Sequence, residues 1–321
     1  MNGRGTAVRK LDILGIFASY GAYITFGALL LLNVFITRNF VSMNVAWNIV
    51  RQSATILLIA EGMTIVISGG GINLAVGSTM ALTSCITAAM LFGPDGSIPG
   101  AIIISAVASA CIGLVIGTII AVFEIQPMIC TIAFSYIIRG GAMLFKNGGL
   151  ISVGNYKFLD FGYYRIGGKA PVQAAVILVT LAIVYIIMRK MKFGRYVEAI
   201  GNNRSASNYA GLNTRGIIIT SYIICCFLAG MAGVLDAART GGSDAMTVGS
   251  TVEMDCVASA VIGGTMLTGG KANILGTMIG VFIMQTITIM INMNNITYEY
   301  SLLIKAGILL LGAVSQQLKR K

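Results

Sequence analysis

Residues 50–78 read VRQSATILLIAEGMTIVISGGGINLAVGS, and this stretch holds both features that decide the fold. Its first part, Val50–Ser68, is mainly apolar and has about the 20 residues that a membrane helix needs. Three consecutive glycines, Gly69–Gly71, then interrupt the helix. Inside a membrane, the backbone groups freed by such a break are tolerated only within protein or beside a water-filled cavity. The stretch therefore predicts a membrane span that ends in a helix break.

The composition extends this reading to the whole chain. Of 321 residues, 56% are hydrophobic and only 10% are charged, whereas soluble domains carry about 25% charged residues. This balance excludes a soluble enzyme, a nucleic-acid-binding module and a disordered tail. Histidine is absent and the six cysteines form no CxxC pair, so we expect no metal site and no enzyme activity. We expect the cysteines to be small buried apolar residues.

Apolar runs of span length recur along the sequence and predict an all-α integral membrane protein with ten transmembrane helices. No stretch between them is long enough for a soluble domain, so residues 1–321 form one membrane-embedded domain. The predicted spans are Leu11–Ile36, Val50–Ser68, Leu74–Phe92, Ala101–Phe123, Pro127–Phe145, Pro171–Met188, Ile217–Ala237, Val252–Leu267, Ile274–Met293 and Ser301–Ser315.

The distribution of basic residues predicts the orientation, because Lys and Arg are enriched in cytoplasmic loops. Basic residues lie near both chain ends and along the segment 189–215. An even number of predicted spans separates these three regions, so we expect both termini and this segment to be cytoplasmic. The segment 146–170 departs from the rule: it holds four basic residues, yet this topology places it outside.

A second glycine-rich cluster, Gly263-Gly264-Thr-Met-Leu-Thr-Gly-Gly-Lys271, resembles the first in character. Each cluster follows a Val-Ile pair and precedes another apolar span. We expect both to be broken helices beside a path across the membrane; the alternative is that glycine merely permits close helix packing. Candidate residues for the path in these clusters are Gly70, Gly71, Asn73, Ser78, Gly263, Gly264 and Thr265.

Ionisable residues inside spans provide further candidates, because a charge placed in the membrane centre costs at least about 2.5 kcal/mol. Glu61 lies deepest, in the middle of its span, and is a candidate functional group of the path. The alternative is a structural ion pair between Glu61 and Arg139, so Arg139 joins the candidate set.

The cytoplasmic segment 193–213 contains the signals of a short helix. Asn203 is a suitable N-cap, Ala206 and Ala210 lie on one face with Tyr209, and Gly211 stops the helix. A helix this short is marginally stable by itself. We expect it to dock on a cytoplasmic partner; the alternative is a surface connector.

Pairs of small residues four positions apart let helix backbones approach closely, and we expect helix packing at each such pair. The pairs are Gly113 with Gly117, Ala229 with Gly233, and Gly276 with Gly280.

Several of these stretches together resemble the permease subunits of bacterial ABC importers for ribose, xylose, galactofuranose and similar sugars. The family's Gly-Gly-Ile-Asp-Leu-Ser-Val-Gly-Ser pattern is matched by residues 70–78, and its cytoplasmic coupling loop by residues 194–213. The span that begins at Pro127 and contains Arg139-Gly140 also resembles a span of the family. Residues 253–277 resemble the family's late glycine-rich signature. The resemblance covers roughly residues 45–315. Asn73 stands where the family has Asp, so this chain has no carboxylate at that position.

The resemblance implies a permease domain in the bacterial inner membrane that imports a pentose, a hexose or a galactofuranose-like sugar. It implies no cofactor on this chain, because ATP is bound and hydrolysed by a partner ATPase, often with two fused cassettes. The other implied partners are an extracytoplasmic sugar-binding protein and a second permease, identical or paralogous, surrounded by membrane lipid. The residues matched to ATPase coupling are Gly194, Arg195, Ala199, Gly201, Asn202, Ala206, Ala210, Gly211, Leu212 and Asn213.

Acidic residues of the outer side, Asp244, Glu253 and Asp255, are candidates for docking the binding protein. Two other functions stay open. An ion-coupled secondary transporter would use Glu61 and other membrane carboxylates and would need no ATPase. A structural membrane scaffold would explain the packing glycines but not a carboxyl inside a span.

Overall fold

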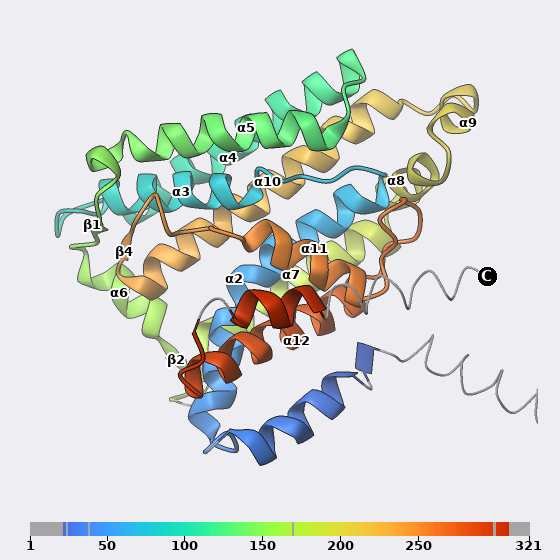
Figure 1. The fold of residues 1–321 in the computed structure, drawn as a ribbon. Coiled ribbons are helices and arrows are strands. Elements are labelled where there is room, and N and C mark those ends of the chain that lie inside the picture. The colour runs from blue at the N-terminus through green and yellow to red at the C-terminus, as the bar shows by residue number, and fades with distance from the viewer. Residues whose placement is uncertain (1–21, 24, 38, 169, 298–299, 308–321) are drawn as a thin grey trace, which may run out of the picture.

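The computed structural model describes residues 22–23, 25–37, 39–168, 170–297 and 300–307. The basic residues near both chain ends, Lys169, and parts of the first and last predicted spans lie outside these residues. Helices dominate the described part and its strands are only two residues long, so the all-α prediction is confirmed (Figure 1).

Helices occupy every predicted span within the described residues. The unlabelled first helix is Thr25–Ile36, and residues 300–307 form the last. Between them run α2 (Met43–Ser68), α3 (Val76–Met90), α4 (Ile98–Phe123), α5 (Pro127–Met143), α6 (Tyr156–Tyr163), α7 (Val172–Arg189), α8 (Lys192–Asn202), α9 (Arg204–Tyr209), α10 (Thr214–Thr240), α11 (Val252–Ile262) and α12 (Ile274–Met293).

Five of the described helices are long and apolar enough to cross a membrane: α2, α4, α7, α10 and α12. These helices differ in burial. In the most apolar 18-residue stretch of α2, 78% of the residues are buried inside the protein, against 22% in that of α7, so α2 lies in the core and α7 at the periphery. The exposed side of α4 carries Ile103, Ile104 and Val107, as expected for a lipid-facing surface. The shorter α3, α5 and α11 adjoin irregular segments, which explains why their apolar helices are curtailed.

The helix α10 lies at the centre of the packing and contacts α2, α3 and α4. Small residues make this possible, as predicted. A Cβ atom added at Gly113 of α4 would lie 2.7 Å from Cα of Ile223, and one at Gly117 would lie 2.9 Å from Cα of Ile219. On α10 itself, Gly233 packs against the backbone of Met80 in α3. These glycines therefore set how closely the helices approach.

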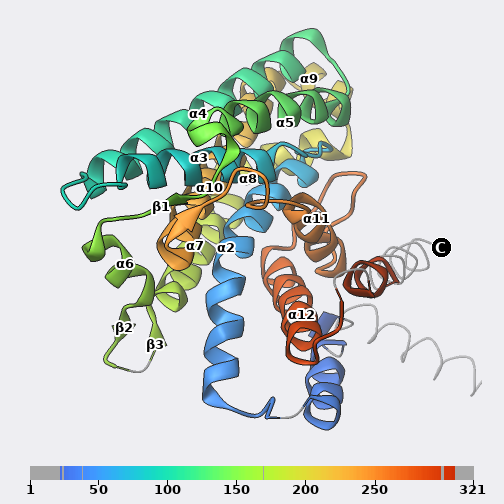
Figure 2. The same ribbon diagram turned by 60° about the vertical axis from the view of Figure 1, so that its left-hand side comes forward.

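The strands are short and lie at one end of the molecule. They are β1 (Ile151–Ser152), paired antiparallel with β4 (Gly242–Ser243), and β2 (Arg165–Ile166), paired antiparallel with β3 (Ala170–Pro171). A 3-10 turn, η1 (Phe145–Gly148), precedes β1. Figure 1 shows β1, β2 and α6 at the left end and α8 and α9 at the right end, with α4, α5 and α10 running between. Figure 2 shows the β2–β3 hairpin lying beyond α6.

Candidate functional site

Both glycine-rich clusters are helix breaks, which confirms the sequence prediction. The chain leaves the helix at Ser68 and resumes at Val76 in the first, and leaves at Ile262 and resumes at Ile274 in the second. Both breaks reach the α8–α9 end of the molecule. There, a pocket of about 310 Å³ is lined by Gly69–Gly71 of the first break, Thr268 of the second, and residues of α2, α4, α8 and α10.

The two breaks begin with the same local geometry. The amide of Gly71 donates to the carbonyl of Val66, and the amide of Thr265 donates to the carbonyl of Ala260. In each case the preceding glycine is left-handed, with φ of +83° at Gly70 and +92° at Gly264. This is the Schellman arrangement that closes helices, and it favours glycine at the left-handed position because glycine has no Cβ.

Each break also contains an asparagine whose side-chain oxygen accepts a backbone hydrogen bond near the start of the next helix, and Asn273 is the N-cap of α12. The amide of Ala75 donates to Asn73 Oδ1 over 3.1 Å, and the amide of Gly276 donates to Asn273 Oδ1 over 3.2 Å. Asn73 is fully buried, and its Nδ2 also donates to the thiols of Cys225 and Cys226 on α10. A carboxylate has no hydrogen to donate to these sulfurs, which explains how asparagine suits this position.

Four residues from three elements form a contact that we call the glycine junction: Ser68 of α2, Gly201 of α8, and Gly269 and Gly270 of the second break. The amide of Gly270 donates to the carbonyl of Ser68 over 2.9 Å. Gly201 fits between them so closely that an added Cβ would overlap the Ser68 oxygen and lie 2.7 Å from the Gly270 nitrogen. The glycine junction therefore joins α8 to both breaks through backbone contacts.

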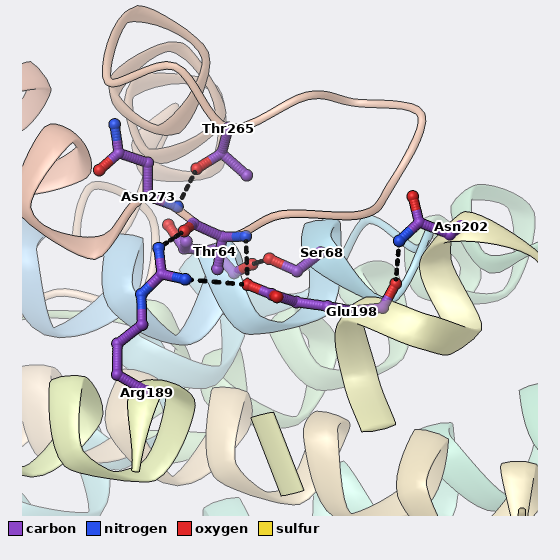
Figure 3. A network of polar contacts seen from close by, with 8 residues as sticks. Thr64, Ser68, Arg189, Glu198, Asn202, Thr265 and Asn273 are labelled. Carbon is purple, nitrogen blue, oxygen red and sulfur yellow. Dashed lines mark hydrogen bonds and ion pairs between the residues drawn. The ribbon is translucent and has the colours of Figure 1, made fainter. Parts of the chain in front are cut away.

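Polar side chains reinforce the glycine junction (Figure 3). Glu198 Oε1 of α8 accepts a hydrogen bond from the amide of Ala272 over 2.9 Å. Arg189, at the end of α7, donates to the carbonyl of Ala272 and lies 3.5 Å from Glu198 Oε1. This ion pair is partly exposed, and such pairs contribute about 1 kcal/mol or less. The packed backbone of the glycine junction is thus the more rigid part of the connection.

The second break is also tied to α2 from the inside. Thr64 of α2 and Thr277 of α12 share a buried hydrogen bond of 2.8 Å. The amide of Asn273 donates to Thr265 Oγ1, and Asn273 Nδ2 donates to the carbonyl of Gly263 over 2.6 Å. Gly263 packs directly against the backbone of Gly276. A displacement of the second break would therefore disturb its contacts with α12 and, through Thr277, those with α2.

The predicted short helix is confirmed as α9, and Asn203 is its N-cap, since Asn203 Oδ1 accepts from the amide of Ala206. Gly211 is left-handed, with φ of +81°, and follows the helix as expected. The helix α8 was not predicted from the sequence, although Phe193, Val197 and Ile200 follow the spacing of an amphipathic helix.

The residues matched to coupling divide into two groups. Gly194, Gly201 and Asn202 belong to α8, where Gly194 packs on the end of α7 and Asn202 Nδ2 donates to the Glu198 carbonyl. The α9 group faces outward. Its exposed members are Ala206, Ala210, Gly211 and Asn213.

Glu61 and Arg139 are not paired, so the alternative of a structural ion pair is wrong. Arg139 donates to the carbonyls of Ala245 and Val248, over 2.8 and 2.6 Å. Glu61 is fully buried in α2, and among the described residues neither of its carboxyl oxygens has a hydrogen-bond partner. Ser78, in the first turn of α3, is also buried.

The acidic residues predicted to dock a binding protein have internal contacts. Asp244 accepts from the amide of Met246 and the hydroxyl of Thr247, which shapes its own loop. Asp255 lies 2.8 Å from Lys305 Nζ in an ion pair whose side chains are only 13% and 15% exposed. Glu253 lies against Gly77 of α3.

Comparison of the sequence with known proteins shows the family of the chain. A family described as "Branched-chain amino acid transport system / permease component" matches residues 45–313, most of the chain. The chain belongs to this permease family. Within the family its similar relatives are sugar permeases of ABC importers, so the sequence prediction of a sugar ABC importer permease is confirmed.

The ribose import permease protein RbsC of Escherichia coli is 33% identical over 285 residues, 88% of each chain. The galactofuranose transporter permease protein YtfT of E. coli and the L-arabinose ABC transporter permease protein AraH of Azospirillum brasilense are each 32% identical, covering 82% of this chain and 76% of theirs. No solved structure matches.

Proposed function

We propose that this permease forms the membrane path of an ATP-driven importer for a pentose, a hexose or a galactofuranose-like sugar. The observation that carries the proposal is the glycine junction, because it connects the helix pair α8–α9 to both helix breaks. ATP is bound and hydrolysed by a cytoplasmic partner ATPase, so the permease itself needs no cofactor and catalyses no reaction.

The surface of α9 supports ATPase docking. Tyr209 is 91% exposed, and tyrosine is enriched where proteins bind one another. Arg204, at the start of α9, lies 3.2 Å from Glu124 between α4 and α5. A polar cleft of about 460 Å³ lies beside these residues and includes Asn208 and Arg215. A partner that pushes α9 would therefore act on α4 and, through α8, on the glycine junction.

Docking of the ATPase on α9 sets the orientation of the permease in the membrane. The α8–α9 end and both chain termini face the cytoplasm of a bacterial cell, and the α6 end faces outside. Two permeases, identical or paralogous, form the path within the lipid bilayer. A sugar-binding protein delivers the sugar from outside. The candidates Gly70, Gly71, Asn73, Gly263, Gly264 and Thr265 belong to the breaks that move with the glycine junction.

Gly211→Pro tests the coupling assignment. Proline requires a negative φ and lacks the amide that donates from Gly211 to the carbonyl of Asn208, so the variant distorts the end of α9. We expect ATP-dependent uptake to fall at least about tenfold, a change of about 1.4 kcal/mol, with the protein retained in the membrane. Uptake assays and ATPase copurification measure this.

Gly148→Pro is the matched control, because Gly148 is also left-handed with open space around it but lies at the α6 end. We expect this control to keep the ATPase bound. Normal ATP-dependent uptake in Gly211→Pro would contradict the coupling assignment.

Glu61→Gln separates this proposal from an ion-coupled carrier. Glutamine preserves the shape of the buried side chain but cannot bind or release a proton. Because no described residue depends on a hydrogen bond to this carboxyl, we expect uptake within about threefold of wild type, less than about 0.7 kcal/mol. Loss of uptake in a normally folded Glu61→Gln protein would instead favour a carrier that uses the carboxyl for ion coupling.

A further inference from the structure

Residues 145–171, which we call the α6 lobe, contain η1, β1, α6, β2 and β3. The helix α5 leads into this lobe from the α4–α5 turn, and α7 leads out of it to α8, so the lobe lies at the opposite end of the spans from α8 and α9 (Figure 1). Under the proposed function, the lobe is therefore the part of the permease that faces outside.

The α6 lobe is held firmly on the helix bundle. Phe158 is buried, and Gly162 packs directly on the backbone of Ala238 in α10. Asn155 Nδ2 donates to the carbonyl of Gly96 over 2.9 Å. The strand β1 pairs with β4, which follows α10. A surface fixed in this way loses little conformational entropy when it binds a partner.

The outward surface of the α6 lobe is rich in tyrosine and basic residues. Tyr156 is 77% exposed, Tyr163 and Tyr164 are each 58% exposed, and Lys157 and Arg165 are exposed beside them. Tyrosine and arginine are enriched where proteins bind one another. In the described residues neither Lys157 nor Arg165 has an ion-pair partner.

The charge of the α6 lobe runs against the usual distribution in membrane proteins. By sequence it carries four basic residues, Lys146, Lys157, Arg165 and Lys169, against the single acid Asp160. Positive charge is normally concentrated on the cytoplasmic side of the membrane. Binding of an acidic partner outside the cell would explain why the α6 lobe carries a basic surface there.

The arrangement favours a protein partner over lipid. A helix that lies in the membrane interface exposes a continuous apolar face. The helix α6 turns Phe158 inward, and its exposed side mixes the charged residues Lys157 and Asp160 with Tyr156 and Phe161, so this side is not a continuous apolar face.

We propose that the exposed face of the α6 lobe, centred on Lys157, Arg165 and the neighbouring tyrosines, is the docking surface for an acidic face of the sugar-binding protein. This inference rests on the proposed function, which supplies that partner. It moves the docking role away from Asp244 and Asp255, whose carboxylates are already engaged within the permease.

The test uses the complex of permease and ATPase in phosphatidylcholine nanodiscs, with the sugar-loaded binding protein that the proposed function requires as the probe. The double variant Lys157→Glu with Arg165→Glu reverses two exposed charges. We expect binding at least about tenfold weaker, because each reversal replaces an attraction by a repulsion. Asp160→Asn is expected to bind more tightly, and higher salt to weaken the wild-type complex.

Lys190→Glu is the matched control, since Lys190 is an exposed cation at the other end of α7. We expect its affinity for the binding protein to equal that of wild type. Wild-type affinity in the double variant would overturn the docking surface. If the double variant also lost thermal stability only in phosphatidylglycerol nanodiscs, that loss would mark the lobe as a lipid anchor. Failure of the wild-type complex to bind at all would instead count against the proposed function.

Discussion

Gly201→Ala is expected to lower sugar uptake at least about tenfold, or about 1.4 kcal/mol, while the ATPase still copurifies. The added Cβ would overlap the carbonyl oxygen of Ser68 and lie 2.7 Å from the nitrogen of Gly270. Because backbone atoms cannot yield as a flexible side chain does, α8 must move away and the hydrogen bond between Gly270 and Ser68 is strained. The exposed surface of α9 is unchanged, so ATPase docking survives while its effect on the breaks is lost.

Gly140→Ala is the matched control for this prediction. Gly140 also lies in a helix, but an added Cβ there would meet nothing within 4 Å. Alanine favours helix formation over glycine by up to about 1 kcal/mol, so this control should be as stable as wild type and transport normally. Uptake by Gly201→Ala equal to that of Gly140→Ala would show that the glycine junction does not transmit the motion.

Lys305→Ala is expected to destabilise the permease by about 3–5 kcal/mol, because it leaves the carboxylate of Asp255 largely buried without its partner. Asp255 lies in the first turn of α11, where the helix dipole also favours a negative charge. The ion pair joins α11 to the helical residues 300–307, so we expect those residues to detach first. Thermal unfolding in detergent measures the loss.

The charge-neutral double variant Asp255→Asn with Lys305→Met is the control, since it removes both charges and leaves none buried alone. We expect it to recover most of the stability that Lys305→Ala loses. Equal stability of Lys305→Ala and wild type would mean that the 2.8 Å ion pair contributes nothing and that Asp255 is free for another role.

The helices were predictable because their physics is local. Runs of apolar residues require helices in a membrane, and α12 begins and ends at the predicted residues 274 and 293. The two breaks and the cap of α9 were predictable for the same reason, since glycine and asparagine act on the backbone of their own neighbours.

The contacts between distant segments were not predictable from the sequence. Nothing in the composition of residues 198 and 272 indicates that Glu198 accepts a hydrogen bond from the amide of Ala272. The suggested pairing of Glu61 with Arg139 failed because backbone carbonyls, which every residue carries, satisfy the guanidinium instead. The ion pair of Asp255 with Lys305 likewise depends on how α11 and the last helix pack.

The role of Gly201 illustrates the difference. The sequence assigns this residue to a coupling loop through family resemblance, and it predicts contact with an external partner. The structure places Gly201 inside the permease, against Ser68 and Gly270. Its lack of a side chain is required by the approach of two other segments, and that approach is defined only by the folded chain.

The most direct measurement of the central claim is sugar uptake by proteoliposomes that contain the permease with the ATPase that copurifies with it. We expect uptake that requires ATP and the binding protein and proceeds without an ion gradient. Uptake by the permease alone, driven by a proton or sodium gradient and independent of ATP, would contradict this claim.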